Sequence, residues 1–182
     1  MMLKQKESRM EDLAKSIFSS ACMYSKAARL MNEAFHKDPS LLMPSFVNAA
    51  LALELYFKSL YFIENNRDFK VNGRHSHDFH ALFSELSKES KEKLLCRFQS
   101  AISSRDMTDV STLENEVKVQ VPLDFEGNLQ SWSGVFTKVR YVYEKREKPV
   151  TMMFFDEIEQ TIRGVIISLR PELKSLQSAH GF

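Results

Sequence analysis

The chain has 182 residues, which is enough for one domain with a proper hydrophobic core and short for two. Its 25 basic and 24 acidic residues give a formal net charge of +1, so binding to nucleic acid would need a local basic patch. The two cysteines, Cys22 and Cys96, form no CxxC motif, and the first residues lack the apolar segment of a signal peptide. These features predict a cytoplasmic protein with reduced thiols and no membrane anchor.

The first predicted element is a long helix from about residue 10 to residue 36, because apolar residues recur there every three or four positions. Asp38, Pro39 and Ser40 then break the helical pattern. A second helix should begin near Pro44, since proline is tolerated in the first turn of a helix. The connection is short, so we expect the two helices to lie antiparallel as a hairpin.

The segment from Phe46 to Ile63, FVNAALALELYFKSLYFI, is the most apolar part of the chain. It has the length of a membrane span, but Glu54 and Lys58 stand near its middle and a polar segment follows it. We therefore expect a buried helix of a soluble bundle. Glu54 and Lys58 are four positions apart in the favoured acid-before-base order, so they can pair along that helix.

Shorter elements are predicted next. A polar loop over residues 65–76 leads into a short helix that opens near His77, and Ser87 is the expected N-cap of a fourth helix. The helical spacing weakens over residues 103–127. The sequence EVKVQVP within them alternates like a strand, but a single strand cannot form a sheet. We therefore expect residues 103–127 to be a long loop or an insertion.

Helical spacing returns over residues 128–144 and again over residues 153–177, where Pro171 should kink or end the last helix. The sequence therefore predicts a single all-α domain over residues 1–182, an up-and-down bundle of about five or six helices. No GxGxxG, P-loop, HExxH or GxSxG motif occurs. That absence disfavours nucleotide-cofactor enzymes, zinc hydrolases and serine hydrolases, so we expect no cofactor.

Three segments resemble signatures of the HEPN superfamily of small helical-bundle proteins, and they occur in the same order. They are AALALELYFKSLYF at residues 49–62, HDFHALF at residues 77–83 and FTKVRYVYE at residues 136–144. The resemblance implies a HEPN-like bundle that is often a homodimer. It also implies an association with RNA cleavage, with toxin and antitoxin pairs, or with defence against phage.

Active members of the superfamily carry an arginine followed a few residues later by a histidine, near the start of a late helix. In them the arginine offsets phosphate charge, and the histidine moves the proton of the attacking 2′-hydroxyl. Arg140 matches the arginine by position, but Lys145 and Arg146 stand where the histidine is required. The candidate catalytic residues are therefore Arg140, with His77 or His80 as an unorthodox partner.

Further polar residues could form a pocket between the helices. The candidate pocket residues are Glu54, Lys58, Asp78, Tyr141, Tyr143 and Glu144. Asp78 is best explained as a group favoured near a helix N-terminus, and His77 as a partner of the Glu54 and Lys58 region. A metal site on His77, Asp78 and His80 is the less favoured alternative. For residues 140–144 the alternative is an amphipathic helix with aromatic anchors.

Two functional hypotheses follow from these observations. The first, favoured because the motif histidine is missing, is a non-catalytic or partner-dependent HEPN-like module in a defence or toxin–antitoxin-type system. Such a module would form a homodimer and associate with RNA or with a partner protein. The second is a metal-independent, toxin-like endoribonuclease that uses the unorthodox Arg/His site. The nine methionines also fit a fold that has been reused to bind an unrelated protein partner.

Overall fold

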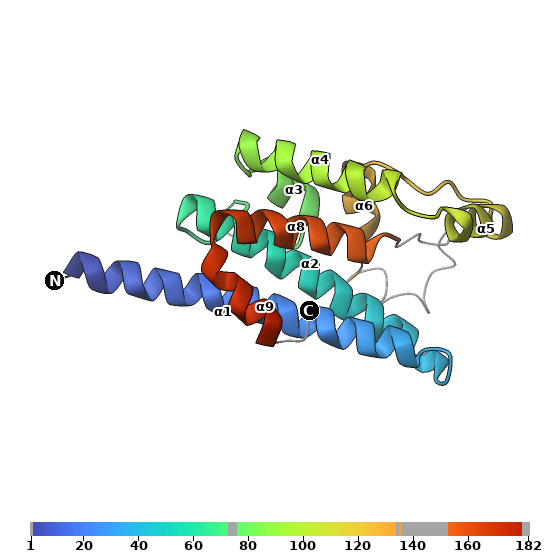
Figure 1. Ribbon diagram of the computed structural model, residues 1–182, viewed down its shortest axis with the longest axis horizontal. Coiled ribbons are helices and arrows are strands. Elements are labelled where there is room, and N and C mark those ends of the chain that lie inside the picture. The colour runs from blue at the N-terminus through green and yellow to red at the C-terminus, as the bar shows by residue number, and fades with distance from the viewer. Residues whose placement is uncertain (1, 73–75, 134, 136–152, 180–182) are drawn as a thin grey trace.

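A computed structural model describes residues 2–72, 76–133, 135 and 153–179 (Figure 1). These residues contain eight α-helices and two 3₁₀ helices, and no β-strand occurs among them. The predicted all-α class is therefore confirmed. The helices outnumber the expected total of about five or six, because short segments between the long helices are themselves helical.

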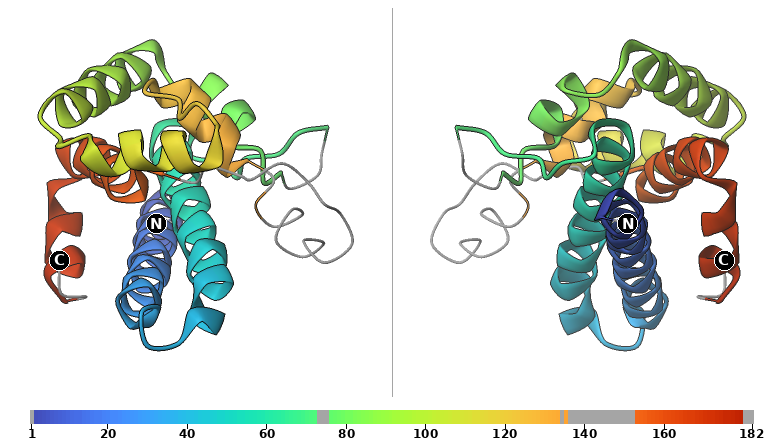
Figure 2. Two further views of the ribbon diagram at one scale, coloured as in Figure 1. Left: turned by 90° about the vertical axis from the view of Figure 1, so that its right-hand side faces the viewer. Right: turned by 90° about the vertical axis from the view of Figure 1, so that its left-hand side faces the viewer.

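The two longest helices form an antiparallel hairpin (Figures 1 and 2). Helix α1 covers Met2–Ala34 and α2 covers Leu42–Asn65, with the 3₁₀ helix η1, Pro39–Leu41, between them. The carboxylate of Asp38 caps η1 by accepting the backbone N–H of Ser40 at 3.1 Å. The predicted break and hairpin are confirmed, although α1 begins earlier than its apolar spacing indicates.

Helix α2 is the central helix of the bundle. Helices α1, α3 and α8 all pack against it, and Leu53, Tyr56 and Phe57 on it have no exposed surface. By length and composition alone, Pro39–Asn65 is also a candidate membrane span. In the structure the apolar side chains of α2 contact other helices instead, which is the expected behaviour of a core helix.

Helices α3 (Phe79–Ser84), α4 (Lys88–Ser103) and α6 (Phe125–Trp132) extend the core on one side of α2. The ring of Phe125 lies at their meeting point, with the ring centroids of Phe83 and Phe98 at 5.5 and 5.2 Å. Ser87 is the N-cap of α4, as predicted, and its Oγ accepts the backbone N–H of Ser90 at 3.2 Å. These contacts join α3, α4 and α6, and the stacked rings of Phe79 and Phe57 hold α3 against α2.

The expectation of a loop or insertion over residues 103–127 is wrong for part of that segment. Helix α5 occupies Thr108–Val117, and α6 already begins at Phe125. Just before α5, Asp106 Oδ1 accepts the backbone N–H of Thr108 at 2.9 Å, and Val110 on α5 is buried against the core. Only Val110 of α5 is buried, and Leu113 is partly buried against the core, which explains why the helical spacing of α5 is weak in the sequence.

The last predicted helix is divided as the proline indicates. Helix α8 covers Phe155–Leu169, η2 covers Pro171–Leu173 and α9 covers Lys174–Ala179. Helix α8 packs on both α2 and α4 through an apolar face. The buried apolar residues of that face are Ile158, Ile162, Val165 and Ile166. Of the helix predicted over residues 128–144, the structure describes the part up to residue 133 and residue 135.

Candidate functional site

The centre of α2 holds a charged pair inside an apolar helix. The side chain of Glu54 is 5% exposed and that of Lys58 is 21% exposed, and the Lys58 ammonium donates to Glu54 Oε1. The predicted pairing along the helix is confirmed. A pair with so little exposure is screened much less by solvent than a surface pair.

His77 approaches this pair from the segment that precedes α3. Its Nδ1 lies 2.8 Å from Glu54 Oε2, so the two oxygens of one carboxylate face Lys58 and His77. The predicted contact between His77 and the Glu54 region is therefore confirmed. Unlike Glu54, the side chain of His77 is 65% exposed. A buried carboxylate thus orients an imidazole that solvent can reach, an arrangement that suits proton transfer.

Asp78 holds the start of α3 in place. Its Oδ1 accepts the backbone N–H of Ala81 at 3.1 Å, which makes Asp78 the N-cap of α3. Ser76 Oγ in turn accepts the backbone N–H of Asp78 at 3.2 Å. The prediction that Asp78 lies at a helix N-terminus is confirmed. Because His77 directly precedes this N-cap, the capping contact also restricts the position of His77.

His80 makes a different contact from His77. Its Nε2 lies 3.6 Å from Glu126 Oε2 on α6, and both side chains are more than half exposed. The structure thus places His77, but not His80, against the Glu54 and Lys58 pair. The other predicted site residues lie outside the described residues. They are Arg140, Tyr141, Tyr143 and Glu144.

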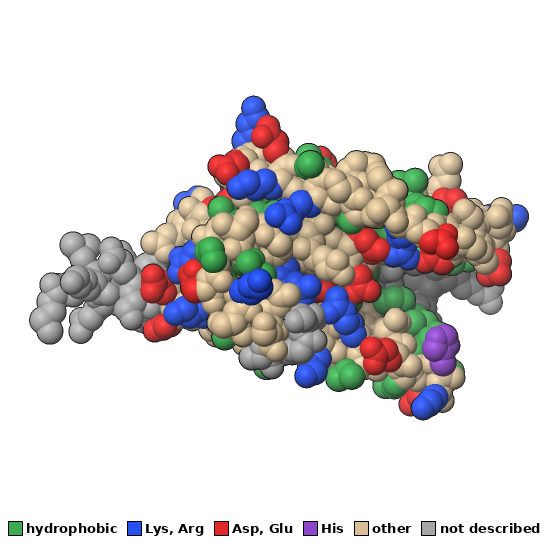
Figure 3. All heavy atoms as spheres, in the orientation of Figure 1, with side chains coloured by type: hydrophobic (Ala, Val, Ile, Leu, Met, Phe, Trp, Pro, Cys, Tyr) green, Lys and Arg blue, Asp and Glu red, His purple; other side chains and the backbone are tan. Residues whose placement is uncertain are grey.

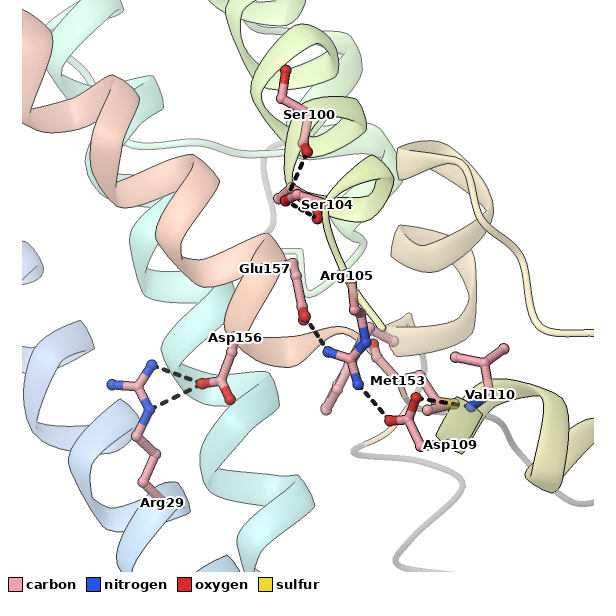
Figure 4. Close-up of polar contacts among 11 residues, drawn as sticks. Arg29, Ser100, Ser104, Arg105, Asp109, Val110, Met153, Asp156 and Glu157 are labelled. Atoms are coloured by element: carbon pink, nitrogen blue, oxygen red, sulfur yellow. Dashed lines mark hydrogen bonds and ion pairs between the residues drawn. The ribbon is translucent and has the colours of Figure 1, made fainter. Parts of the chain in front are cut away.

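A second polar cluster, which the sequence patterns did not reveal, joins α1, α2 and α8. At its centre Glu159 has no exposed surface. The Tyr56 hydroxyl donates to Glu159 Oε1 at 3.0 Å, and Arg163 Nη1 donates to the same oxygen at 3.1 Å. Arg29 donates to Glu159 Oε2 and to Asp156 Oδ1, the latter from Nη2 at 2.7 Å (Figure 4).

One sequence signal could have identified this cluster. Glu159 lies four positions after Phe155 and three before Ile162, so it falls on the apolar face of α8. A charged residue on such a face needs a partner, because burying an unpaired charge is costly. The sequence did not indicate which residues of α1 and α2 would supply that partner.

The protonation chemistry of the second cluster suits a structural role. Burial, followed by the nearby Glu159 carboxylate, raises the pKa of the Tyr56 hydroxyl far above its usual value. Burial also raises the pKa of the Cys22 thiol, whose sulfur lies 3.4 Å from the Tyr56 hydroxyl oxygen. Burial alone would lower the pKa of Arg29, but Glu159 and Asp156 raise it. Neutral phenol and thiol groups are poor nucleophiles, so these two groups are not suited to covalent catalysis. The role that remains for the cluster is to hold α1, α2 and α8 together.

Within the described part of the chain, no group of three or more His, Cys, Asp or Glu side chains is arranged to hold a metal ion. Comparisons with protein-family models, with curated proteins and with solved structures gave no significant match for this chain.

Proposed function

We propose that this protein is a non-catalytic, HEPN-like interaction module that forms a homodimer through α1. The observation that carries the proposal is a second apolar face on α1, which the described helices leave exposed. Leu13, Met23, Tyr24 and Leu30 are 43%, 52%, 38% and 56% exposed on this one helix. An amphipathic helix of a monomeric bundle normally has a single apolar face, directed at its core.

The two faces of α1 lie on opposite sides of the helix. Phe18, Ala21, Ser25 and Ala28 form the buried face. Between Leu13 and Ala34, the side chains that fall on the exposed face at 3.6 residues per turn are all small or apolar. We call this face the α1 stripe. Its members are Leu13, Ser16, Ile17, Ser20, Met23, Tyr24, Ala27, Leu30, Met31 and Ala34.

The spacing of the α1 stripe suits another helix as its partner. Ser20, Ala27 and Ala34 recur every seven positions, and bulkier residues such as Met23 and Leu30 stand between them. Small residues at a regular interval let a second helix approach closely, while the bulky ones fill the spaces beside it. A second copy of α1 would present the complementary pattern, as a two-fold symmetric dimer requires.

The face of the molecule shown in Figure 3 gives no sign of a site for RNA. On this face, acidic and basic side chains are interspersed, and no extended area of one sign is seen. This face therefore lacks the concentrated positive charge that binds phosphates. Of the hypotheses drawn from the sequence, these features support best a HEPN-like homodimer in a defence or toxin–antitoxin-type system.

The mass in solution tests the proposal. We expect light scattering coupled to gel filtration to give a dimer of the full chain, with Leu30→Glu giving a monomer because the charge would be buried in the interface. Leu95→Glu is the matched control, since Leu95 on α4 is 39% exposed but lies outside the α1 stripe. A parent protein that stays monomeric at every concentration, or a dimer that Leu30→Glu leaves intact, would contradict it.

A second candidate function is a metal-independent endoribonuclease, and the contact between His77 and Glu54 favours it. A carboxylate bound to Nδ1 favours the proton on that nitrogen and fixes the ring, which is how many general-base histidines are oriented. In this scheme His77 would accept the proton of a 2′-hydroxyl, and Arg140 would offset the charge of the phosphate.

RNA cleavage distinguishes the second candidate from the first. Purified protein is incubated with mixed RNA with and without a chelator, beside the His77→Ala and Arg140→Ala variants and a His36→Ala control. Cleavage that resists the chelator and is lost in His77→Ala and Arg140→Ala, but not in His36→Ala, would establish the enzyme. An intact dimer with no cleavage supports the interaction module.

A further inference from the structure

We propose that the two copies of α1 in the dimer lie antiparallel, with Lys26 of each copy beside the partner's Glu33. This inference rests on the proposed function, because it takes the α1 stripe as the contact surface. It adds the direction and the register of the partner helix. Two features of α1 carry it, the alternation of side-chain size along the stripe and the two charges at its edge.

Side-chain size alternates along the centre of the α1 stripe. Met23 and Leu30 are 52% and 56% exposed, whereas the small residues Ala27 and Ala34 are partly buried. From Met23 to Ala27, Leu30 and Ala34 the intervals are four, three and four positions. This is the spacing at which two helices pack side by side in a coiled coil. The centre of the stripe is therefore a seam in which small and large residues take turns.

The alternation decides the direction of the partner helix. In a parallel dimer each residue meets its own copy, so Ala27 would face the partner's Ala27 and Leu30 the partner's Leu30. Layers of two small residues leave cavities, and layers of two large residues push the helices apart. In an antiparallel dimer Ala27 meets the partner's Leu30, and Ala34 meets the partner's Met23. Each layer then joins a small residue to a large one, so the helices keep one close distance.

The charges beside the seam decide the register. Lys26 and Glu33 are both exposed and lie on the same edge of the α1 stripe. They are seven positions apart, about 10 Å along the helix, so they do not pair within one chain. In the antiparallel dimer this edge faces the same edge of the partner, which places Lys26 beside the partner's Glu33. On the other edge Tyr24 meets the partner's Met31, a favourable contact of ring and sulfur.

The longer overlaps of the two helices bring like charges together. If the partner slides by seven positions, Ala27 still meets a large residue, the partner's Met23. Lys26 then faces the partner's Lys26 at the two-fold axis, and the two ammonium groups repel each other. A slide by seven further positions places Asp12 beside the partner's Glu33, which is again unfavourable. The proposed register instead forms two contacts of opposite charge, related by the two-fold axis.

Exchange of the two charges tests the inference. Lys26→Glu makes this edge of the helix acidic at both positions, and Glu33→Lys makes it basic at both. Each variant alone sets like charges against each other, so we expect its dissociation constant to be about tenfold higher than that of the parent. An equimolar mixture of the two variants pairs opposite charges again, so a heterodimer should form with the dissociation constant of the parent. Analytical ultracentrifugation at low salt measures the constants, and native mass spectrometry identifies the heterodimer.

Asp12→Lys is the matched control. It changes the net charge as Glu33→Lys does and lies on the same edge of α1, fourteen positions before Lys26, but outside the overlap. Its dissociation constant should equal that of the parent. A parent protein that stays monomeric would overturn the proposed function together with this inference. A dimer whose mixed variants form no heterodimer, or that the single charge changes leave unaltered, would overturn the antiparallel register alone and leave the α1 dimer standing.

Discussion

At Glu159, one carboxylate without exposed surface connects three helices. It accepts hydrogen bonds from Arg29 on α1, Tyr56 on α2 and Arg163 on α8. Glu54 on α2 is similar in that each carboxylate has a basic partner one turn along its own helix, Lys58 for Glu54 and Arg163 for Glu159. The difference is that Glu159 also has two partners on other helices, and both of those helices are distant in the sequence.

Removing the charge of Glu159 should therefore destabilise the fold strongly. We expect Glu159→Gln to lower the free energy of unfolding by about 3 kcal/mol, because the partly buried guanidinium groups of Arg29 and Arg163 would lose the charge of the carboxylate that they share. Urea denaturation would measure this as a lower midpoint with an unchanged slope. Gln160→Ala, at the exposed next position, should change the free energy by less than about 0.5 kcal/mol. Equal effects of the two substitutions would contradict the role given to Glu159.

Tyr56 makes the free energy of unfolding depend on pH in the alkaline range. Its pKa is raised in the fold above the ordinary value of 10.0, so above that pH the folded chain binds a proton more tightly than the unfolded chain. The contribution is complete below about pH 10 and is lost above it, with a slope of at most about 1.4 kcal/mol per pH unit.

As the pH rises from neutral to above about 10, we expect the free energy of unfolding to fall less for Tyr56→Phe than for the parent protein. At neutral pH the variant should be less stable by about 1.5 kcal/mol, since the hydrogen bond to Glu159 is missing. Urea denaturation at a series of pH values measures both effects. Parallel pH profiles for the parent and Tyr56→Phe would show that Tyr56 titrates normally.

At the scale of single helices, local chemistry sets where elements begin and end. Ser87, Asp78 and Asp38 cap the elements that they precede, and α8 ends before Pro171. These boundaries could be predicted, because caps and proline act within a few residues of the chain. The helix α5 could not, since a single buried residue, Val110, gives too little periodicity.

Two helical glycines should respond in opposite ways to substitution by alanine. A Cβ at Gly164 on α8 would lie 2.8 Å from Arg97 Nη1, the end of a flexible side chain that can move away. We expect Gly164→Ala to raise the free energy of unfolding by about 0.5–1 kcal/mol, because alanine loses less conformational entropy in a helix. Thermal or urea denaturation of the purified variant measures the change.

Gly127 on α6 is the matched comparison. A Cβ there would lie 2.7 Å from Pro122 Cβ and 2.9 Å from Asp124 Oδ2. Asp124 caps α6 by accepting the backbone N–H of Gly127 at 2.7 Å, so neither neighbour can move without a loss. We expect Gly127→Ala to destabilise the protein by about 1–2 kcal/mol. Stabilisation by both substitutions would mean that helix propensity alone decides the outcome.

At the scale of the whole molecule, the packing of α2 bears on where the protein resides. By composition alone Pro39–Asn65 could cross a membrane, but Glu54 and Lys58 lie at its centre and three helices cover it. We expect the full chain to remain in the supernatant after ultracentrifugation of a lysate without detergent, with a known integral membrane protein as the control. Recovery in the membrane pellet that resists alkaline carbonate would contradict this expectation.

The sequence by itself determined the all-α class, the central helix, the main helix ends and the pairing of Glu54 with Lys58, because periodicity, caps and pairs one turn apart act locally. Only the tertiary structure decided that His77 and not His80 meets that pair. It also brought Arg29, Tyr56 and Glu159 together and left the α1 stripe exposed. These features depend on how helices distant in the sequence cross one another, and no local pattern encodes that geometry.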